Sequence, residues 1–302
     1  MASVVGLLDQ SQLTARDAKR QRASSLHLIV TYGASVAMFL LITFVIGTIL
    51  VRGIPMLTWD FISQKPVEGM SAGGIWPMIR GSLLLMCGTL LMVLPIGIFG
   101  GIFLAEYAGT GRFSRMMHAC VTSLAGTPSI IYGLFGLAVF VLLFHLGISL
   151  VAGWLTLTLF ALPVVVLTTE SAIKAVPAHH FEAAEALGLS RWQAMWRVIL
   201  PQALPGIATG IVLTTGRAAG EAPPILLTAG IYYSTGELVL NAETLKQPVA
   251  NLPYHLAEAY RQGGTIPEKI IWGTCLVLML MVLSVNLVAI VVRTRIRVRQ
   301  NA

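Results

Sequence analysis

The sequence is poor in charged residues. Asp, Glu, Lys and Arg together make up 11% of its 302 residues, whereas 56% of the residues are hydrophobic. Soluble proteins carry about 25% charged residues. The composition therefore excludes a sizeable soluble domain and predicts an all-α protein that crosses a membrane several times.

The chain also lacks motifs for catalysis and for binding nucleotides or metals. It has no Gly-x4-Gly-Lys-Ser/Thr phosphate loop, no HExxH and no GxSxG. The cysteines, Cys87, Cys120 and Cys275, lie in apolar segments without CxxC spacing, and the adjacent His179 and His180 are expected to point away from each other on a helix. We therefore expect no enzymatic activity and no metal or cofactor bound by this chain.

Long runs without a charged residue are the main feature that is present. They cover Ala23–Val51, Gly81–Ala105, Met116–Thr169 and Ile270–Val292, and about 20 apolar residues suffice for one span. The run from Met116 is long enough for two spans, with a turn expected near residues 145–153. With a further segment after Pro205, the runs predict six transmembrane helices, at about 26–51, 81–105, 118–144, 150–170, 205–231 and 270–292.

The basic residues predict the orientation of these spans. Of the 20 Lys and Arg residues, 13 lie in the N-tail (1–22), the 106–117 turn, the polar segment after the fourth span and the C-tail (293–302), whereas six lie in the alternate loops. By the positive-inside rule, both termini and the polar segment are cytoplasmic. The two tails flank a membrane domain at 23–292, which contains the polar segment. We expect the first span to be retained, because its apolar run exceeds a signal-peptide core. The net charge of +7 then reflects topology and not a nucleic-acid partner.

The polar segment after the fourth span reads EAAEALGLSRWQAMWRVILP from Glu182 to Pro201. Pro177 suits a first helical turn, Gly188 supplies a C-terminal stop, and Ser190 with Gln193 makes a capping box. Two short helices are therefore expected.

The first of these helices has a small apolar stripe of Phe181, Ala184 and Leu187 that needs a packing partner. From composition alone, a loop on the membrane surface is equally favoured, with Trp192 and Trp196 at the interface.

The spacing within the segment resembles the EAA loop of ABC importer permeases, whose pattern is E-A-A-x3-G-x9-I-x-L-P. Val198 stands where the pattern usually has Ile. In that family the loop sits in a cleft of an ATP-binding subunit and passes its closure to the membrane helices. The resemblance implies coupling to an ATPase dimer that uses ATP and Mg²⁺, through Glu182, Ala183, Ala184, Gly188, Leu200 and Pro201.

Two charged residues, Arg217 and Glu221, lie inside the expected fifth span. On a helix they share one face about 18 Å from Pro205, near the bilayer midplane. Charged side chains inside a membrane are costly unless they are paired or hydrated. The two residues therefore form either a structural ion pair that neutralises itself or an anion relay. In the relay, Arg217 binds the negative charge of the substrate, and Glu221 neutralises Arg217 when the path is empty. The nearby glycines permit close helix contact or leave space for a solute, and Pro223–Pro224 should break the helix.

Two further segments resemble phosphate-specific ABC permeases. RAAGEAPPILLTA, from Arg217 to Ala229, is similar to their R-A-A-G-E-T-A-P-L-L-F-T-A, and GTPSIIYGLFG, from Gly126 to Gly136, to their G-x-P-S-I-x-Y-G-L-F-G. The similarity covers about residues 70–292, and TIPEKIIWG before the last span is closer to the A-type subunit than to the C-type. The family's intramembrane Arg and Glu, implicated in phosphate passage, correspond to Arg217 and Glu221. Ala222 replaces the family's Thr, so no role of that Thr carries over.

The resemblance implies a permease subunit of an ABC importer for inorganic phosphate in the bacterial plasma (inner) membrane. Its implied partners are a second homologous permease, an ATPase dimer and an external phosphate-binding protein, within the lipid bilayer. One alternative is the same machine for another oxyanion, such as molybdate or sulfate. Another is an ion-coupled secondary transporter or channel; a membrane-embedded enzyme would need a nucleophile or metal cluster that the sequence lacks.

Overall fold

A computed structural model describes residues 28, 30–67, 70–109, 111–232, 243–261, 264 and 266–301. The chain divides into two units, Met1–Arg52 and Gly53–Ala302. In the first unit, residues 30–52 are helical, and the N-tail expected at 1–22 lies outside the described residues. The second unit holds the remaining helices and is described below by itself.

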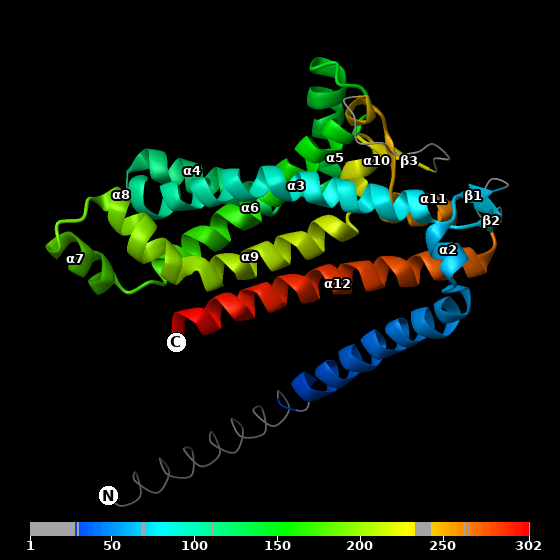
Figure 1. Ribbon diagram of the computed structural model, residues 1–302, viewed down its shortest axis with the longest axis horizontal. Helices are drawn as coiled ribbons and strands as arrows, with labels where there is room; N and C mark the ends of the chain where they lie inside the picture. Colours follow the sequence, from blue (N-terminus) through cyan, green and yellow to red (C-terminus); the bar gives the residue numbers. More distant parts are fainter. Residues whose placement is uncertain are drawn as a thin grey trace, which may run out of the picture. The chain divides into compact units, whose positions relative to one another are not determined.

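Four long helices of the second unit run side by side (Figure 1). They are α3 (Trp76–Ile102), α6 (Leu150–Lys174), α9 (Leu200–Gly220) and α12 (Glu268–Asn301). Helix α6 packs against α3 and α9, and α12 packs against α9. The described residues contain five helices that are long and apolar enough to cross a membrane, or six if one bent helix pair counts as a span.

Glycines set the close approach of these helices. A Cβ atom at Gly97 or Gly101 of α3 would lie 2.6 Å from Val165 or 2.5 Å from Thr169 of α6. On α9, Gly210 is even tighter, since its Cβ would lie 2.0 Å from the hydroxyl oxygen of Thr168. Of the two roles expected for the glycines near Arg217, Gly210 has that of close helix contact. Larger side chains at these glycines would separate α6 from both neighbours.

The third expected span, 118–144, differs from the structure. Helix α4 (Arg112–Ala125) is followed by α5 (Ser129–Gly136) and a π-helical segment, η4 (Leu137–Leu143), and the two halves are bent by 102°. Pro128 precedes α5 in an extended conformation, with φ −57° and ψ 139°, because proline cannot continue the hydrogen bonding of α4. Helix α5 therefore projects from the bundle (Figure 1).

The fifth expected span, 205–231, differs at both ends. A continuous helix runs from α8 (Arg191–Ala194) through the π-helical η5 (Met195–Ile199) into α9 and ends at Gly220. The helix ends there because Pro223 has no N–H to donate to the carbonyl four residues earlier, and because the proline ring clashes with that carbonyl. A short helix, α10 (Pro223–Leu226), follows the break.

Other boundaries also differ. Gly153, expected in the turn before the fourth helix, lies in the first turn of α6. The turn itself is present, with positive φ values of 52° at His145 and 66° at Gly147. Helix α12 continues beyond Val292 to Asn301, so the basic residues of the expected C-tail extend the last helix.

Short elements close the two ends of the bundle. At one end lies α7 (Ala178–Ala186), beside α8, and α3 ends there in the π-helical η3 (Phe103–Tyr107). At the other end two-residue strands pair, β1 with β2 antiparallel and β3 with β4 parallel. The elements there are η1 (Ile54–Met56), α2 (Trp59–Ser63), β1 (Pro66–Val67), β2 (Ala72–Gly73), β3 (Gly230–Ile231), η6 (Thr244–Lys246), β4 (Val249–Ala250) and α11 (Leu252–Arg261).

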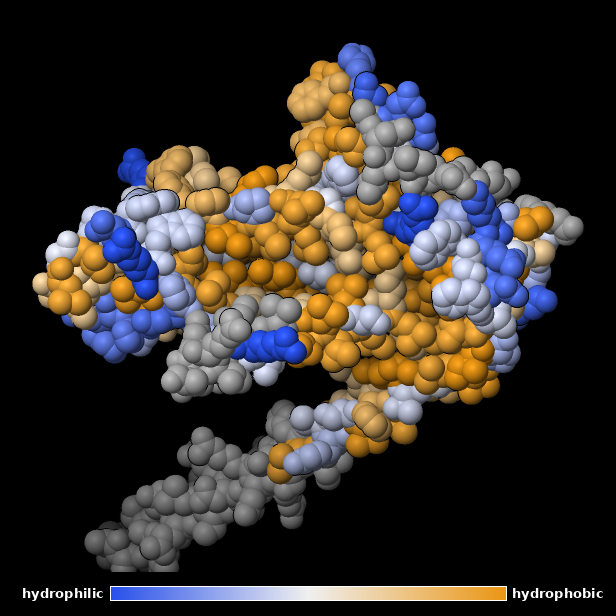
Figure 2. Space-filling view, viewed as in Figure 1, coloured by the Kyte–Doolittle hydropathy of each residue, from blue (hydrophilic) through white to orange (hydrophobic). Residues whose placement is uncertain are grey.

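The surface of the second unit separates into apolar and polar zones. Hydrophobic residues cover the middle of the bundle in Figure 2, whereas hydrophilic residues gather near α7 and α8 at one end and near β1 and β2 at the other. This distribution fits a helical bundle embedded in a bilayer, with its polar ends in water.

Candidate functional site

Arg217 and Glu221 lie at the end of α9 but do not form an ion pair with each other, although both side chains are described. Arg217, in the last turn, is exposed, and its guanidinium carbon lies 4.9 Å from the centroid of the Phe160 ring on α6. Glu221 lies beyond the helix, with φ −79° and ψ 122°. Because it has left the helix, it no longer shares the helical face of Arg217, as the sequence had suggested.

The Glu221 carboxylate instead interacts with the side chain of Ser129, at the start of α5, while also lying within the field of Arg217. Helix α5 reaches this position because it packs on α10: a Cβ atom at Gly133 would lie 2.8 Å from the carbonyl oxygen of Pro223. The helix break before α5 and the break after α9 therefore meet. They bring together the two segments that the sequence resemblance singled out separately.

Aromatic and hydroxyl groups complete this meeting point, which we call the break site and define by Ser129, Tyr132, Phe160, Thr214, Arg217 and Glu221. The Tyr132 ring contacts the Phe160 ring edge-on at 5.5 Å between centroids, and its hydroxyl donates a 2.7 Å hydrogen bond to the Leu124 carbonyl. Thr214 lines a crevice with Phe160 and Arg217, and its buried hydroxyl has no hydrogen-bond partner among the described residues.

The break site joins a cation, a carboxylate and hydroxyls at non-helical backbone. Irregular backbone at membrane depth is tolerated where it is buried in protein or lines a cavity. Broken helices of this kind bind ions in other membrane proteins. Gly220, beside Glu221, faces open space in this chain, whereas the Cβ of Gly216 would contact Asn286 of α12. The arrangement can bind a small anion on the exposed face of α9.

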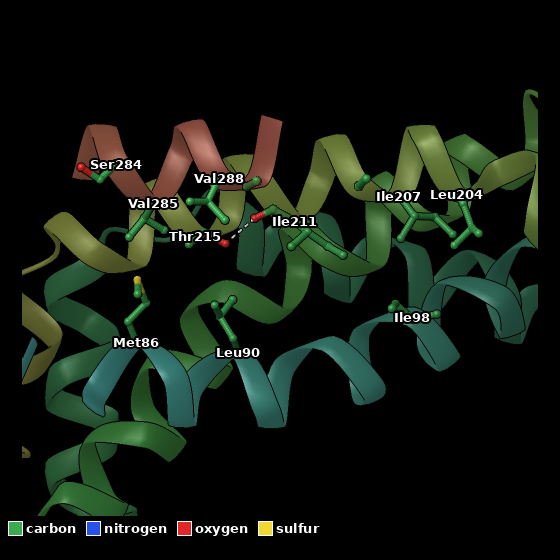
Figure 3. Close-up of a pocket in the computed structure, with 12 residues that line it drawn as sticks. Met86, Leu90, Ile98, Leu204, Ile207, Ile211, Thr215, Ser284, Val285 and Val288 are labelled. Carbon is green, nitrogen blue, oxygen red and sulfur yellow. Dashed lines mark hydrogen bonds between the residues drawn. The ribbon is translucent and has the colours of Figure 1, made fainter. Parts of the chain in front are cut away.

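The large cavity between α3, α9 and α12 has a different character (Figure 3). Its volume is about 540 Å³, and its lining has no charged side chain. The two hydroxyl groups in the lining, of Thr215 and Ser284, donate to carbonyls of their own helices at 2.7 Å. An anion would find no free donor there, so the cavity is not a candidate for an ion path.

The polar segment at the other end folds as its local sequence predicts. Helix α7 ends at Ala186, and Gly188 has a φ of +80°, which strains any residue with a side chain. Ser190 and Gln193 form the expected capping box at the start of α8. The first predicted short helix and the capping signals are confirmed, whereas the second helix is not short, since α8 continues through η5 into α9.

The residues of the EAA pattern lie on both the buried and the exposed side of this segment. Ala184 is buried, at 3% exposure, whereas Glu182, Ala183 and Gly188 are exposed. Leu200 and Pro201 begin α9, within the continuous helix that starts at Arg191, after the turn that follows α7, and ends at the break site.

One part of the expected apolar stripe is wrong. Phe181 packs against a buried cluster that includes Ile173 of α6 and Met195 of η5, but Leu187 is 83% exposed because it lies past the end of α7. Trp196 packs against Phe99 of α3 at 6.0 Å, and Trp192 is 55% exposed.

Ion pairs that sequence reasoning missed hold this end together. Arg191 of α8 lies 3.8 Å from Glu106 of η3 and 3.6 Å from Glu185 of α7. The expectation that His179 and His180 point apart is also wrong, since their ring centroids are 4.3 Å apart.

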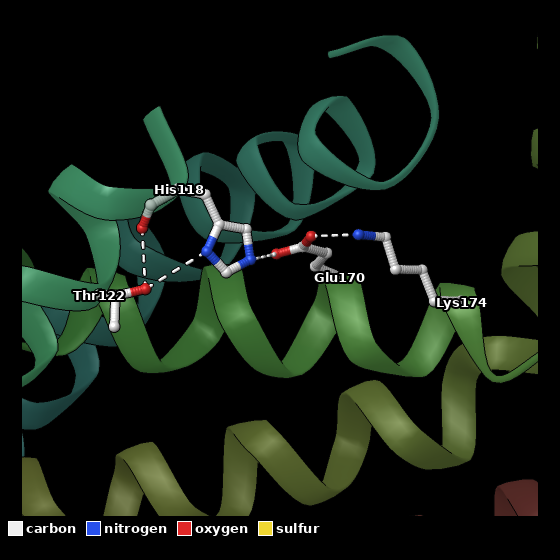
Figure 4. A network of polar contacts seen from close by, with 4 residues as sticks. All are labelled: His118, Thr122, Glu170 and Lys174. Carbon is white, nitrogen blue, oxygen red and sulfur yellow. Dashed lines mark hydrogen bonds and ion pairs between the residues drawn. The ribbon is translucent and has the colours of Figure 1, made fainter. Parts of the chain in front are cut away.

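A second cluster was missed on α4 and α6 (Figure 4). The Nε2 atom of His118 lies 3.2 Å from one carboxylate oxygen of Glu170, and the other carboxylate oxygen lies 2.6 Å from Lys174. The spacing of Glu170 and Lys174, four residues apart, was a signal that could have indicated their contact. The partner on α4 had no sequence signal.

Comparisons with known proteins agree with this architecture. The family model described as "Binding-protein-dependent transport system inner membrane component" matches residues 97–300. Among curated relatives, "Probable ABC transporter permease protein YqgI" of Bacillus subtilis is 38% identical over 252 residues, covering 80% of this chain and 85% of that protein. "Phosphate transport system permease protein PstA" of Haemophilus influenzae is 31% identical over 271 residues, covering 89% and 93%.

Solved structures show the same fold. A bacterial ABC transporter involved in the import of the acidic polysaccharide alginate aligns with a TM-score of 0.64 and 18% identity, covering 93% of this chain and 98% of that chain. The inward-facing MetNI methionine ABC transporter aligns with a TM-score of 0.55 and 18% identity, covering 74% and 94%.

Proposed function

Because the chain belongs to the family of binding-protein-dependent transport system inner membrane components, and is thus an ABC importer permease subunit, we propose that it carries inorganic phosphate. The single observation that supports this substrate most directly is the break site, where the two phosphate-permease-like segments meet around Arg217 and Glu221. Curated relatives named as phosphate transport permeases support it as well.

In this proposal Arg217 binds the phosphate anion as it passes the middle of the membrane. The guanidinium is exposed and rests on the Phe160 ring instead of on a carboxylate, so it is available to a substrate at little electrostatic cost. Glu221 and Ser129 then line the same passage. The carboxylate limits how strongly the site holds an anion, because a site that binds too tightly would not release it.

The exposed position of Arg217 requires a second surface to close the passage. We propose that this surface belongs to a second, related permease, and that an external phosphate-binding protein delivers the substrate. The EAA segment, from Glu182 to Pro201, docks an ATPase dimer that uses ATP and Mg²⁺. By the distribution of Lys and Arg, this segment and both termini face the cytoplasm.

The decisive experiment is ATP-dependent phosphate uptake by the complete complex in proteoliposomes, with molybdate and sulfate as competitors. Phosphate uptake that neither competitor inhibits is the expected result. Transport of molybdate or sulfate without phosphate would instead support the same machine for another oxyanion. The Bacillus subtilis relative does not decide between these candidates, because its name gives no substrate.

Substitution of Arg217 tests the role of the break site. We expect Arg217→Ala to lower uptake at least about tenfold, since a hydrogen bond to a charged group contributes about 1.5–3 kcal/mol. Arg217→Lys, which keeps the charge, should retain part of the activity. Both variants must first be shown to assemble at wild-type levels; normal uptake by assembled Arg217→Ala would refute an anion-binding role.

A further inference from the structure

Among the acids that form ion pairs at the end of the bundle near α7, namely Glu106, Glu170 and Glu185, the Glu170 carboxylate is the most deeply buried. Its side chain is 5% exposed on α6, whereas its cationic partners, His118 and Lys174, are 50% and 57% exposed. One carboxylate oxygen contacts Lys174 on the same helix, and the other contacts His118 on α4 (Figure 4). A buried carboxylate with one partner removed is strongly destabilised, so both contacts are expected to persist as the protein moves.

The contacts around His118 orient its ring towards α6. The Thr122 hydroxyl donates to the His118 carbonyl at 2.8 Å, and its oxygen lies 3.3 Å from His118 Nδ1. The other ring nitrogen, Nε2, lies 3.2 Å from the Glu170 carboxylate, to which it donates a hydrogen bond. Contacts at both ring nitrogens therefore fix the direction of the link between α4 and α6.

The position of Glu170 on α6 places it next to the EAA segment. Helix α6 ends one turn later at Lys174, and only residues 175–177 separate it from α7. The close glycine contacts with Val165, Thr169 and Thr168 leave α6 no space to slide against α3 or α9. Movement imposed on α7 is therefore transmitted to α3, α6 and α9 together.

Helix α4 is attached differently. None of its 14 residues is buried, and only Ser114, Met117, Val121 and Ala125 are half-buried, so α4 is packed less tightly than α6 or α9. Its main neighbour is α6. At its far end, the Leu124 carbonyl accepts the hydrogen bond of Tyr132, and the chain then turns into Ser129 of the break site. Helix α4 thus extends from near Glu170 to the break site, and the polar contacts of His118 and of the Leu124 carbonyl add to its small packed face.

We propose that the ion pair between His118 and Glu170 makes α4 follow α6, so that ATP-driven movement of the EAA segment reaches the break site. His118, Glu170 and Lys174 are then positioning residues for transport, which do not touch the phosphate. This inference rests on the proposed function of the chain as an ATP-coupled phosphate permease. It assigns to α4 the role of moving Ser129 relative to Glu221.

The test measures phosphate moved per ATP hydrolysed by the complete complex in proteoliposomes. We expect His118→Leu and Glu170→Gln each to lower this ratio at least about fivefold, the lower end of the usual coupling between distant sites, while binding-protein-stimulated ATP hydrolysis continues. The double variant should lose no more than Glu170→Gln alone, because both changes break one contact. Arg115→Gln, which removes an exposed cation one turn earlier on α4, is the matched control and should keep the wild-type ratio.

The outcomes separate this inference from the proposed function. A wild-type complex that moves no phosphate refutes the function. A functional wild type whose His118→Leu and Glu170→Gln variants keep the normal ratio refutes the role of the ion pair, as does a proportional loss of transport and ATP hydrolysis, which a merely structural role predicts. If the Glu170→Gln variant does not assemble, the His118→Leu variant alone tests the role of the ion pair. Its assembly is expected because the His118 side chain is half exposed.

Discussion

At the scale of single residues, three charged groups of this protein have partners that are distant in sequence. Arg217 rests on Phe160, Glu221 interacts with Ser129, and Glu170 is shared by His118 and Lys174. Each buried or half-buried charge must be compensated, because desolvating an ion costs more than most single contacts return. The compensating partners therefore show where segments meet. Two of these contacts involve α4 or the start of α5, through His118 and Ser129.

His255 provides a prediction at this scale that is independent of transport. It lies on α11, outside the candidate spans, and its side chain is fully buried beside the Tyr232 ring at 5.4 Å. Burial lowers the pKa of His255 from 6.5 to about 4, and a backbone interaction with Tyr232 only partly opposes this shift. The imidazole is therefore neutral in the folded protein at pH 7.

The lowered pKa of His255 sets the direction of a pH effect on stability. Above pH 6.5 the residue is neutral in both states, and as pH falls towards 4 the unfolded state gains a proton that the folded state does not. Stability should therefore be lost over this window, by about 3 kcal/mol from this residue. Thermal unfolding in detergent at pH 7 and pH 4.5 measures the loss.

The variant His255→Phe should make unfolding temperature less dependent on pH than in the wild type, because phenylalanine cannot take up the proton. The comparison between the two proteins removes the effect of carboxylates that also titrate. An equal fall in unfolding temperature for both proteins would show that His255 does not contribute.

At the scale of elements, the apolar runs located the helices but not their bends. An uncharged run has the same composition whether its helix is straight or broken, so 118–144 was expected to be one span and is two segments at 102°. The caps were predictable because they depend on neighbours three or four residues away, as with Gly188, Ser190 and Gln193. The exposure of Leu187 was not predictable in this way, because Leu187 lies one residue beyond the end of α7 and so leaves the apolar face of that helix.

The close packing of α9 on α6 gives a prediction at this scale. A methyl group at Gly210 would overlap Thr168, including its Cβ at 2.6 Å, which rotation of the side chain cannot relieve. Gly210→Ala should therefore destabilise the protein by about 1–3 kcal/mol, the usual cost of overpacking. It should lower the unfolding temperature and, by separating the two helices, phosphate uptake.

The matched control is Gly47→Ala in the helix of the first unit, where a Cβ atom would meet nothing within 4 Å inside that unit. The same substitution there should leave both unfolding temperature and uptake unchanged. Equal behaviour of the two variants would contradict the contact between α9 and α6.

At the scale of the whole molecule, the fold links an exposed helix at one end to a charged break in the membrane region. The link is the helix from Arg191 to Gly220, which continues over 30 residues. Arg191 also contacts η3 and α7 through Glu106 and Glu185. Phe181 of α7 packs against the buried cluster that includes Ile102 of α3 and Ala203 of α9, so we expect movement of the EAA segment to reach α3 and α9.

Deletion of Glu182–Gly188 distinguishes the function classes at this scale. An ABC permease should lose its association with the ATPase subunits, because α7 no longer presents its exposed face, and ATP-dependent uptake should fall to background. Co-purification of the ATPase with the tagged permease measures the association. Uptake driven by an ion gradient in the deleted protein, without ATPase, would instead identify a secondary transporter.

The sequence by itself determined the membrane-spanning class, the helical caps of the EAA segment and the family, because these depend on composition and on neighbours close in the chain. It also singled out Arg217 and Glu221, since a charge in an apolar run is conspicuous wherever the run folds. Only the tertiary structure decided that Glu221 interacts with Ser129, that Arg217 lies on Phe160, and that His118 lies on Glu170. These pairs join residues about 50 to 90 positions apart, and their meeting depends on the glycine contacts and helix breaks that orient whole elements.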